Sequence, residues 1–465
     1  MALALLLTTF MMNTNLLNDK VVFQKVSKPK KSPLLYALTI LLFATILVAA
    51  GRSFAASNVE QAGVEASQVS PTIKDEIIAD HQNRLSADFK IPENLKKRVG
   101  FWFDIYSKYS ASEHVIHHVD YPWIVFSIYN EKAIADAAGN RWTKYHKTRA
   151  AVSLEKKRVQ RMLLKLAKKK NYANLSEEEQ KYFDLMKDVP GSRPKVFKHA
   201  AYNIRGQLGQ KDFMLSGLHT SGKYLPTMEK TFAEKGLPTE ITRLPLVESS
   251  FNEAAVSKVG ASGIWQLMPK IGRHFLYVDS VIDERNSPLK ATEAAAKLLK
   301  QNLQILKKWP LALTAYNHGP GGIIKASKKV KSDDIGVIIE NYSSRSFGFA
   351  SSNFYCSFLA ALHVEKYQKE VFGEIPRHEH LQLTASPVRK SLPMKKIAEA
   401  AGLAWEDFLK LNLDIRKQAI SKNRKLPSGF RLLLPAENAQ KLEAYYDSLP
   451  TSISQRATKA SEKKL

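Results

Sequence analysis

Cysteine is almost absent from this sequence, because Cys356 is the only one among 465 residues. One thiol can close no disulfide within the chain and cannot build a multi-thiolate metal site. Disulfide-rich folds and zinc-ribbon classes are therefore excluded. We expect Cys356 to be a small, buried, apolar residue.

Acidic residues are also few compared with basic ones. The chain has 44 Asp and Glu against 70 Lys and Arg, which gives a formal net charge of +26. A charge of this size indicates an anionic partner, and its sign alone does not distinguish nucleic acid, acidic lipid and an acidic polymer. The 44% hydrophobic and 25% charged residues argue against wholesale disorder. The length predicts about three folded units.

A long uncharged run lies near the start of the chain. Five lysines lie in Lys20–Lys31, the apolar run Leu34–Ala50 follows, and the small-residue segment Ser53–Ala56 comes next. This order is typical of an export signal, although the run also approaches the length that spans a bilayer. We expect a signal peptide or membrane anchor at 1–56, a linker at 57–71, and a body in the periplasm or tethered to the inner membrane. No cysteine follows the run, so we expect no lipoprotein anchor.

The next part of the sequence changes character twice. Apolar and polar residues alternate over 114–129, which predicts a β-hairpin with Ile128 among its packing residues. Over 147–170, apolar residues such as Leu154 recur at helical spacing among many lysines and arginines. The basic face of that helix is either solvated or a contact surface for an anionic polymer or membrane. We expect 72–190 to form a mixed α/β region.

Helical signals dominate the sequence after the turn at Pro190-Gly191. Ser287 precedes Pro288 at the start of a long apolar-periodic segment, an order typical of a helix N-terminus. We expect a mainly α-helical domain over 191–375. A small α+β unit follows at 376–450, and a disordered tail at 451–465.

One glutamate follows an apolar helical segment. Glu248 ends the sequence Leu-Pro-Leu-Val-Glu, and Ser249 and Ser250 come directly after it. Desolvation raises the pKa of a carboxyl group, so a glutamate in this setting can keep its proton near neutral pH and act as a general acid. By itself this pattern more often marks a capping or solvated residue.

Two further segments give the glutamate a context. Residues 260–269 read Gly-Ala-Ser-Gly-Ile-Trp-Gln-Leu-Met-Pro, and Ala315-Tyr316-Asn317 lies further along the chain. With Glu-Ser before them, in this order and at these separations, they resemble the lytic transglycosylase domain, a lysozyme-like fold. The likeness is greatest to the membrane-bound lytic murein transglycosylase D family, because Gly236-Leu237-Pro238 and Asp283-Glu284-Arg285 also match. The resemblance covers 195–362.

The resemblance implies roles for four residues in the first two segments. Glu248 is the sole catalytic acid and base. Ser249 orients the acetamido group or the carboxyl of the substrate. Gln266 and Met268 line the glycan groove.

It implies further roles on a facing helix. Tyr316 holds Glu248 by a hydrogen bond, and Asn317 fixes the helix or a sugar. One departure from the family pattern lies downstream, where the family has a tyrosine and Phe354 stands here, with Tyr355 next to it. The departure puts the role of a second tyrosine in doubt and leaves the acid unaffected.

The family chemistry needs one carboxyl group, no metal and no cofactor. The resemblance implies cleavage of the β-1,4 bond between N-acetylmuramic acid and N-acetylglucosamine, with a 1,6-anhydro ring formed at the muramic acid. Peptidoglycan glycan strands are then the partner, and we expect a monomer. Two alternatives stay open, a hydrolytic muramidase of the same fold and a catalytically silent wall-binding scaffold.

Three other features are weaker signals of function. His318–Gly322 lacks the Lys-Ser/Thr ending of a phosphate-binding loop, so a helix end and turn is expected. His114, His117 and His118 lack a further ligand at suitable spacing, so we expect no metal site. Nucleic acid is not expected as a partner, because neither zinc spacing nor a helix-turn-helix signature is present.

The C-terminal unit resembles a degenerate LysM glycan-binding module. Short helical segments over 392–412 lead to Leu-Asn, and 426–435 has the Pro-x-Gly-x-x-Leu-x-Leu-Pro-like order. The usual opening Gly-Asp-Thr is replaced by Ser391-Leu392-Pro393. The unit either binds N-acetylglucosamine in the glycan or serves only as a packing domain.

Overall fold

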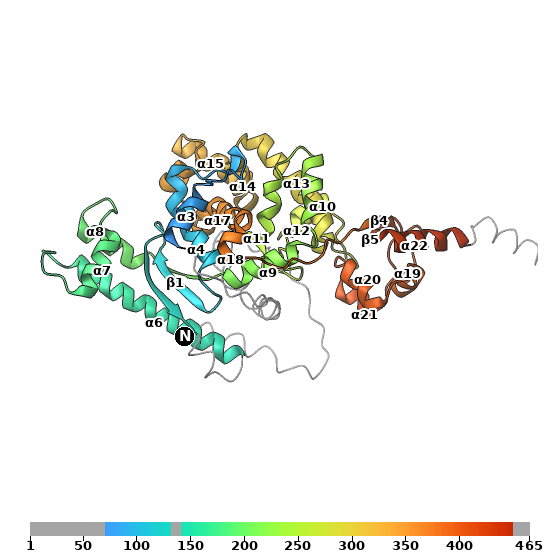
Figure 1. Ribbon diagram of the computed structural model, residues 1–465, viewed down its shortest axis with the longest axis horizontal. Helices are drawn as coiled ribbons and strands as arrows, with labels where there is room; N and C mark the ends of the chain where they lie inside the picture. Colours follow the sequence, from blue (N-terminus) through green and yellow to red (C-terminus); the bar gives the residue numbers. More distant parts are fainter. Residues whose placement is uncertain (1–69, 132–140, 450–465) are drawn as a thin grey trace, which may run out of the picture.

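The computed structural model describes residues 70–131 and 141–449 and is mainly α-helical (Figure 1). A small sheet lies in the N-terminal part and a second one in the C-terminal unit, so the expected fold class is confirmed. The predicted signal peptide or anchor and the predicted tail lie outside the described residues. Within the described ranges, no helix is long and apolar enough to cross a membrane.

The N-terminal sheet has three antiparallel strands in the order β2-β1-β3. Its strands are β1 (Glu113–His118), β2 (Val125–Asn130) and β3 (Ile204–Leu208). The predicted hairpin is therefore confirmed as β1 and β2. The predicted packing role of Ile128 is wrong, because this residue lies near the end of the edge strand β2 and is 46% exposed. Strand β3 comes from beyond the basic helix and pairs with β1.

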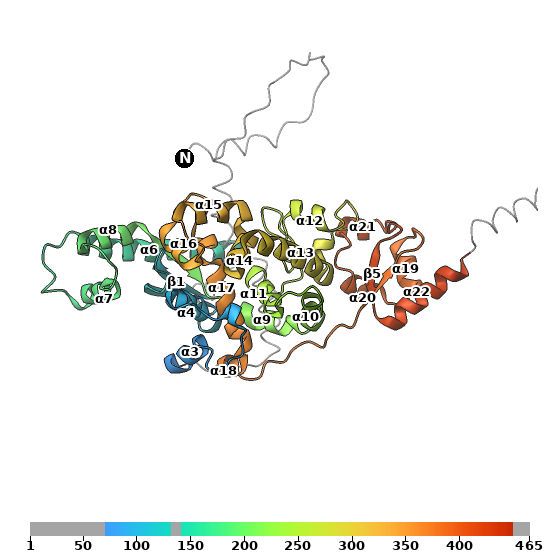
Figure 2. The same cartoon turned by 90° about the horizontal axis from the view of Figure 1, so that it is seen from above.

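Three helices form an arm that covers this sheet and extends away from the main body (Figure 2). They are α6 (Arg141–Ala167), α7 (Glu177–Met186) and α8 (Arg193–Tyr202). The predicted basic helix is confirmed as α6, which buries Leu163 in a core with Phe126 and Phe197. The expectation that Leu154 packs is wrong. It lies nine residues from Leu163, half a turn around the helix, and is 66% exposed among the lysines.

The main body has one hydrophobic core, which combines residues from before and after the arm. Helix α17 (Phe349–Lys366) crosses its middle and is buried along most of its length, including Cys356, as expected for that thiol. Helix α4 (Lys96–Ser107) packs directly on α17. The core therefore extends across the domain boundary that the sequence predicts at residue 190.

The remaining helices of the body surround α17. They are α3 (Pro71–Ile78), α9 (Lys211–Ser221), α10 (Leu225–Glu234), α11 (Leu244–Glu248), α12 (Pro269–Phe275), α13 (Pro288–Leu306), α14 (Trp309–His318), α15 (Pro320–Val330), α16 (Ile335–Asn341) and α18 (Gln368–Phe372). Short 3-10 turns occupy Ala87–Phe89, Glu93–Leu95, Thr239–Arg243 and Glu284–Asn286. Helix α13 begins at Pro288, as predicted, but the Ser287 hydroxyl does not cap it.

The C-terminal unit has a core of its own and lies at the end of the molecule opposite the arm (Figure 2). Strands β4 (Thr384–Pro387) and β5 (Arg431–Leu434) form an antiparallel pair. Its helices are α19 (Met394–Ala400), α20 (Trp405–Leu411), α21 (Lys417–Ser421) and α22 (Ala436–Ser448). Ile282 of the main body packs into this core, so the two units are in direct contact.

Candidate active site

Glu248 is the last residue of α11 and stands on an unusual turn. Ser250 and Phe251, two and three residues after it, have φ angles of 52° and 53°, in the left-handed region that residues with a side chain seldom adopt. Phe251 is fully buried in the core, which holds the turn in place. Strained backbone of this kind is typical of functional sites.

Helix α9 packs against this turn at very short range. A Cβ atom on Gly217 would lie 2.9 Å from the Ser250 carbonyl oxygen and 3.2 Å from Leu246 Cδ2. Only glycine allows this approach without a shift of the backbone. The position of Glu248 therefore depends on close packing between α9 and α11.

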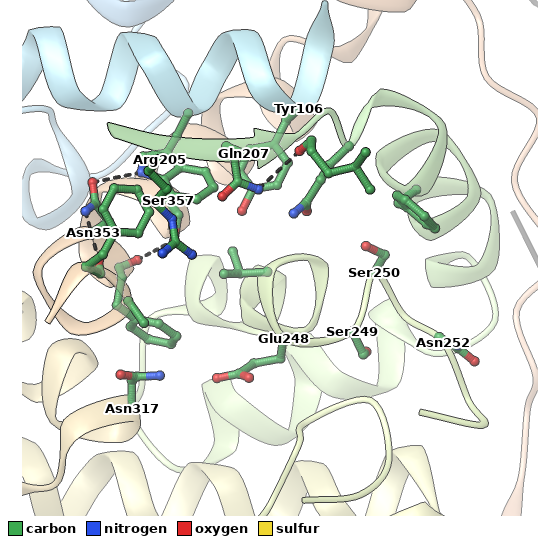
Figure 3. Close-up of a pocket in the computed structure, with 18 of the residues that line it drawn as sticks. Tyr106, Arg205, Gln207, Glu248, Ser249, Ser250, Asn252, Asn317, Asn353 and Ser357 are labelled. Atoms are coloured by element: carbon green, nitrogen blue, oxygen red, sulfur yellow. Dashed lines mark hydrogen bonds between the residues drawn. The ribbon is translucent and has the colours of Figure 1, made fainter. Parts of the chain in front are cut away.

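A cavity of about 200 Å³ opens beside Glu248 (Figure 3). Its walls come from α4, β3, α9, α11, α14 and α17, and most of the surface that they expose to the cavity is apolar. The lining residues are Trp102, Tyr106, Arg205, Gln207, Leu208, Gln210, Phe213, Ser216, Val247, Glu248, Ser249, Ser250, Asn252, Asn317, Phe349, Ala350, Asn353, Phe354 and Ser357. Among these described residues, Glu248 is the only acid. A mix of aromatic surfaces and polar side chains is typical of a ligand site.

The Glu248 carboxyl group is held in its protonated form. Burial raises its pKa to about 8, because the charged form loses water that its apolar surroundings do not replace. Burial and then the nearby Glu248 charge also raise the pKa of Tyr316. A carboxyl group that keeps its proton at neutral pH can donate it to a leaving oxygen.

Ser249 and Asn317 both line the cavity. The Ser249 hydroxyl is 2.9 Å from the Ile264 carbonyl oxygen, to which it donates, and the residue is only 3% exposed. Asn317 is exposed, and its Oδ1 accepts a hydrogen bond from Ser351. The substrate contacts predicted for Ser249 and Asn317 stay predictions.

The predicted hydrogen bond from Tyr316 to Glu248 is wrong. The Tyr316 hydroxyl donates to the Trp265 carbonyl oxygen at 2.6 Å. Trp265 is fully buried, and its Nε1 donates to Thr292 Oγ1 at 2.8 Å. Its carbonyl is thereby fixed within reach of α14, and Tyr316 connects that helix to the Gly-Ile-Trp-Gln loop.

Gln266 and Met268 do not line the cavity. Gln266 has a φ of 46°, and its Nε2 donates to the carbonyl oxygens of Ala255 and Gly263, so its side chain closes the loop on itself. Met268 is 41% exposed at the N-terminus of α12. Their predicted place along a longer glycan groove stays a prediction.

The structure distinguishes the two aromatic residues at the position where the sequence departs from the family. Phe354 lines the cavity. Tyr355 points the other way, is 1% exposed, and its hydroxyl lies 3.4 Å from the Asp88 carbonyl oxygen. Of these two residues, the one at the cavity therefore has no hydroxyl group.

Several cavity residues come from parts of the chain that carry no motif. Trp102 and Tyr106 lie on α4, and Arg205 and Gln207 on β3. Asn353 on α17 connects that helix to α4, since its Oδ1 accepts a hydrogen bond from Trp102 Nε1 at 3.1 Å. The alternation of polar Arg205 and Gln207 with apolar neighbours is a signal for a strand with one polar face. No sequence signal placed that strand beside Glu248.

One group of residues near the sheet has the spacing of metal ligands. Ligand atoms of His118, Asp120 and His199 lie within 4.8 Å of one another. His118 Nδ1, however, accepts the backbone N–H of Asp120 at 3.0 Å and that of Tyr121 at 3.3 Å. The proton of a neutral His118 then belongs on Nε2, which leaves neither nitrogen free as a ligand.

Comparison with known families identifies the part of the chain that carries Glu248. Residues 227–339 match the model of the transglycosylase SLT domain. The chain contains an SLT domain. Glu248, Gln266 and Tyr316 lie inside the match, whereas Arg205 and Phe354 lie outside it. Residues 382–451 match the LysM-like domain of lytic transglycosylase MltD.

Two curated relatives of this SLT-domain chain carry the name membrane-bound lytic murein transglycosylase D. They come from Escherichia coli strain K12 and from Escherichia coli O6:H1, and each is 28% identical over 187 residues. The match covers 39% of this chain and 40% of each relative, so the chain spans well under half the length of the relatives it matches.

A solved structure also matches in part. It is the lytic transglycosylase Slt of Pseudomonas aeruginosa, an inactive mutant, at 18% identity and a TM-score of 0.25. The match covers 43% of this chain and 30% of that one. A TM-score this low supports no conclusion about the fold.

Proposed function

We propose that this protein is a peptidoglycan lytic transglycosylase in which Glu248 acts first as general acid and then as general base. The observation that carries the proposal is a single protonated carboxyl group in an apolar cavity of an SLT domain. Two-carboxylate glycosidases need a second acid roughly 5–9.5 Å from the first. Among the described cavity residues none supplies it.

The proposed reaction balances without water. Glu248 gives its proton to the glycosidic oxygen, and the bond from C1 of N-acetylmuramic acid to that oxygen breaks. The acetamido oxygen of the same sugar stabilises the positive charge at C1. The Glu248 carboxylate then removes the proton of the C6 hydroxyl, and O6 bonds to C1 to close the 1,6-anhydro ring. Glu248 is left protonated for the next turnover.

The rest of the cavity supports binding of a sugar. Trp102, Phe349 and Phe354 supply flat apolar surfaces, and Asn317 supplies an amide near the acid. Apolar walls also keep water away from the carboxyl group, which maintains its raised pKa.

A conservative substitution tests the role of Glu248. Glu248→Gln keeps the size of the side chain and removes its acid proton, so turnover of purified sacculi is expected to fall at least about 1000-fold. Binding to sacculi, measured by sedimentation, is expected to persist.

The control is Glu234→Gln in α10, where the exposed side chain forms an ion pair with Lys230 at 4.0 Å. It is expected to match the unmodified protein in activity. Undiminished release of muropeptides by Glu248→Gln contradicts the proposal, whichever product forms.

We further propose that the protein works in the cell envelope and that its LysM-like unit contacts glycan. The relatives' name, the match of residues 382–451 and the charge of +26 support this assignment. Fractionation of cells that produce the full chain tests it, with recovery in the cytosolic fraction as the contrary result.

A further inference from the structure

One cationic side chain lines the cavity without a carboxylate beside it. Arg205 on β3 lines the cavity, and its Nε is buried without a hydrogen-bond partner. No acidic residue in the described part of the chain forms an ion pair with it. Burial lowers the pKa of its guanidinium, and no neighbouring carboxylate offsets this effect. Even a half-buried charge without a counter-ion is costly to the fold.

Arg205 is half-buried, whereas three arginines are fully buried in the described part of the body, and all three are satisfied. Arg243 pairs with Glu365 at 3.0 Å, and Arg285 pairs with Asp283 at 2.8 Å. Arg98 donates to Asn353 Oδ1 at 3.1 Å and to a backbone carbonyl oxygen at 2.7 Å. Arg205 is therefore the exception, and local rules are most often broken where function requires it.

The position of Arg205 is suited to a ligand. Its guanidinium carbon lies 4.3 Å from the centre of the Phe349 ring, which holds the side chain against the wall of the cavity. Gln207, two residues along the same strand face, lines the same cavity. Figure 3 shows Arg205 and Gln207 on one side of the pocket and Glu248 on the other.

The neighbouring histidine adds no competing charge. His117 pairs with Arg205 across β1 and β3, and its Nδ1 bonds to the His118 carbonyl oxygen at 2.8 Å. Burial, with a smaller effect from Arg205, lowers the pKa of His117 to about 3, so it stays neutral. The guanidinium is then the cationic group that β3 presents to the cavity.

We propose that Arg205 binds a carboxylate of the glycan substrate and selects strands that carry one at the muramic acid. This inference rests on the proposed function and adds a binding residue outside the matched SLT segment. Arginine suits the task because its fork of N–H donors matches a carboxylate. The carboxylate has two sources, the lactyl group of muramic acid after the stem peptide has been removed, and the stem peptide itself.

Binding without turnover tests the inference. In the Glu248→Gln background, calorimetry compares Arg205→Met and Arg205→Lys with the parent protein on three ligands. The ligands are glycan strands with stem peptides, strands stripped of stems by an amidase, and neutral N-acetylglucosamine oligomers. Lys156→Met is the matched control. Lys156 lies outside the cavity on α6, and burial, with a smaller effect from the nearby Arg205 charge, lowers its pKa.

Arg205→Met is expected to weaken binding of carboxylate-bearing strands about tenfold or more. Binding of the neutral oligomers is expected to stay unchanged, and Arg205→Lys to restore part of the loss. Loss confined to stripped strands identifies the lactyl carboxylate, and loss confined to stem-bearing strands identifies the peptide. Equal affinity of Arg205→Met and parent for both strand types overturns the inference.

A second measurement separates recognition from a structural role. Because Arg205→Met removes a half-buried charge that has no counter-ion, its Tm is expected to equal or exceed that of the parent. A marked fall in Tm together with equal losses on all three ligands contradicts the inference. The proposed function is judged separately, because it fails only if Glu248→Gln retains turnover.

Discussion

The Glu248 carboxyl group combines two properties that oppose each other. As an acid for sugar chemistry it needs a proton at neutral pH, and burial supplies this by raising its pKa to about 8. Once ionised, the same group is poorly solvated in the folded protein. The raised pKa that suits this residue to catalysis therefore lowers the stability of the folded protein once the pH exceeds the ordinary pKa of a glutamate.

That trade-off predicts how stability responds to pH. The folded-state pKa of Glu248 lies above the unfolded value, so the native state binds more protons between about pH 4.5 and pH 8, and stability falls as pH rises through this window. Glu248→Gln removes this effect. Its free energy of unfolding is expected to match that of the unmodified protein at about pH 4 and to exceed it by on the order of 1–3 kcal/mol at about pH 8.5.

Urea unfolding at the two pH values measures this difference. Glu234→Gln, at an exposed position, is the control and is expected to show no such dependence. A Glu248→Gln variant that is equally stable relative to the unmodified protein at both pH values argues against a raised pKa.

The turn after α11 depends on elements that are distant in the sequence. Helix α9 reaches it through Gly217, and Phe251 anchors it in the core. The left-handed residues Ser250 and Phe251 leave little freedom for adjustment. Precision at the acid is therefore set by helix packing.

Gly217→Ala is expected to disturb this packing. The new Cβ meets the Ser250 carbonyl oxygen at 2.9 Å, so the turn must shift, which costs about 1–3 kcal/mol of stability and lowers kcat. The control is Gly321→Ala in α15, where nothing lies within 4 Å of the new Cβ. Thermal unfolding and sacculus turnover measure both variants. If the two alanine variants have the same Tm and the same turnover, the close packing of α9 on the turn does not set the position of Glu248.

The sequence predicted local structure better than it predicted contacts between distant segments. Local patterns predicted the β1–β2 hairpin, the basic helix α6 and Glu248 at a helix end. Contacts between segments were harder to predict. Tyr316 bonds to the Trp265 carbonyl oxygen instead of Glu248, because a motif gives the order of residues and not the direction of a hydroxyl. Leu154 shows that helical spacing alone does not tell which face is covered.

The sequence did not predict that α4 and β3 form walls of the cavity, for a similar reason. Trp102 and Arg205 lie far from Glu248 in the sequence, and only the shared core brings them together. Non-local pairing of this kind leaves no periodic signal in one sequence. The domain boundary predicted at residue 190 reflects a change in the sequence pattern. The hydrophobic core of the main body contains residues from both sides of that boundary.

The LysM-like unit is attached to the main body by a buried charged cluster. Lys290 on α13 lies 2.7 Å from Asp414 and 3.1 Å from Glu284, and its Nζ sits 4.1 Å from the centre of the Phe430 ring. Arg416 adds a contact to Asp283 at 3.0 Å. Polar contacts and the insertion of Ile282 fix the orientation of the LysM-like unit relative to the site.

Removal of one partner is expected to loosen this junction. Asp414→Ala leaves Lys290 buried with Glu284 alone, which is expected to cost about 3 kcal/mol. Limited proteolysis between 373 and 384, with urea unfolding, measures the effect. Lys441→Ala, which breaks an exposed pair with Glu437, is the control and is expected to change stability by less than about 0.5 kcal/mol. A negligible effect of Asp414→Ala contradicts a role for the cluster in docking.

Mass spectrometry of the fragments released from sacculi addresses the reaction itself. The account predicts products that end in 1,6-anhydromuramic acid, one water lighter than hydrolysed fragments, and their disappearance with Glu248→Gln. Products that carry the added water identify a hydrolase, and products of either kind from Glu248→Gln show that the proton comes from another group.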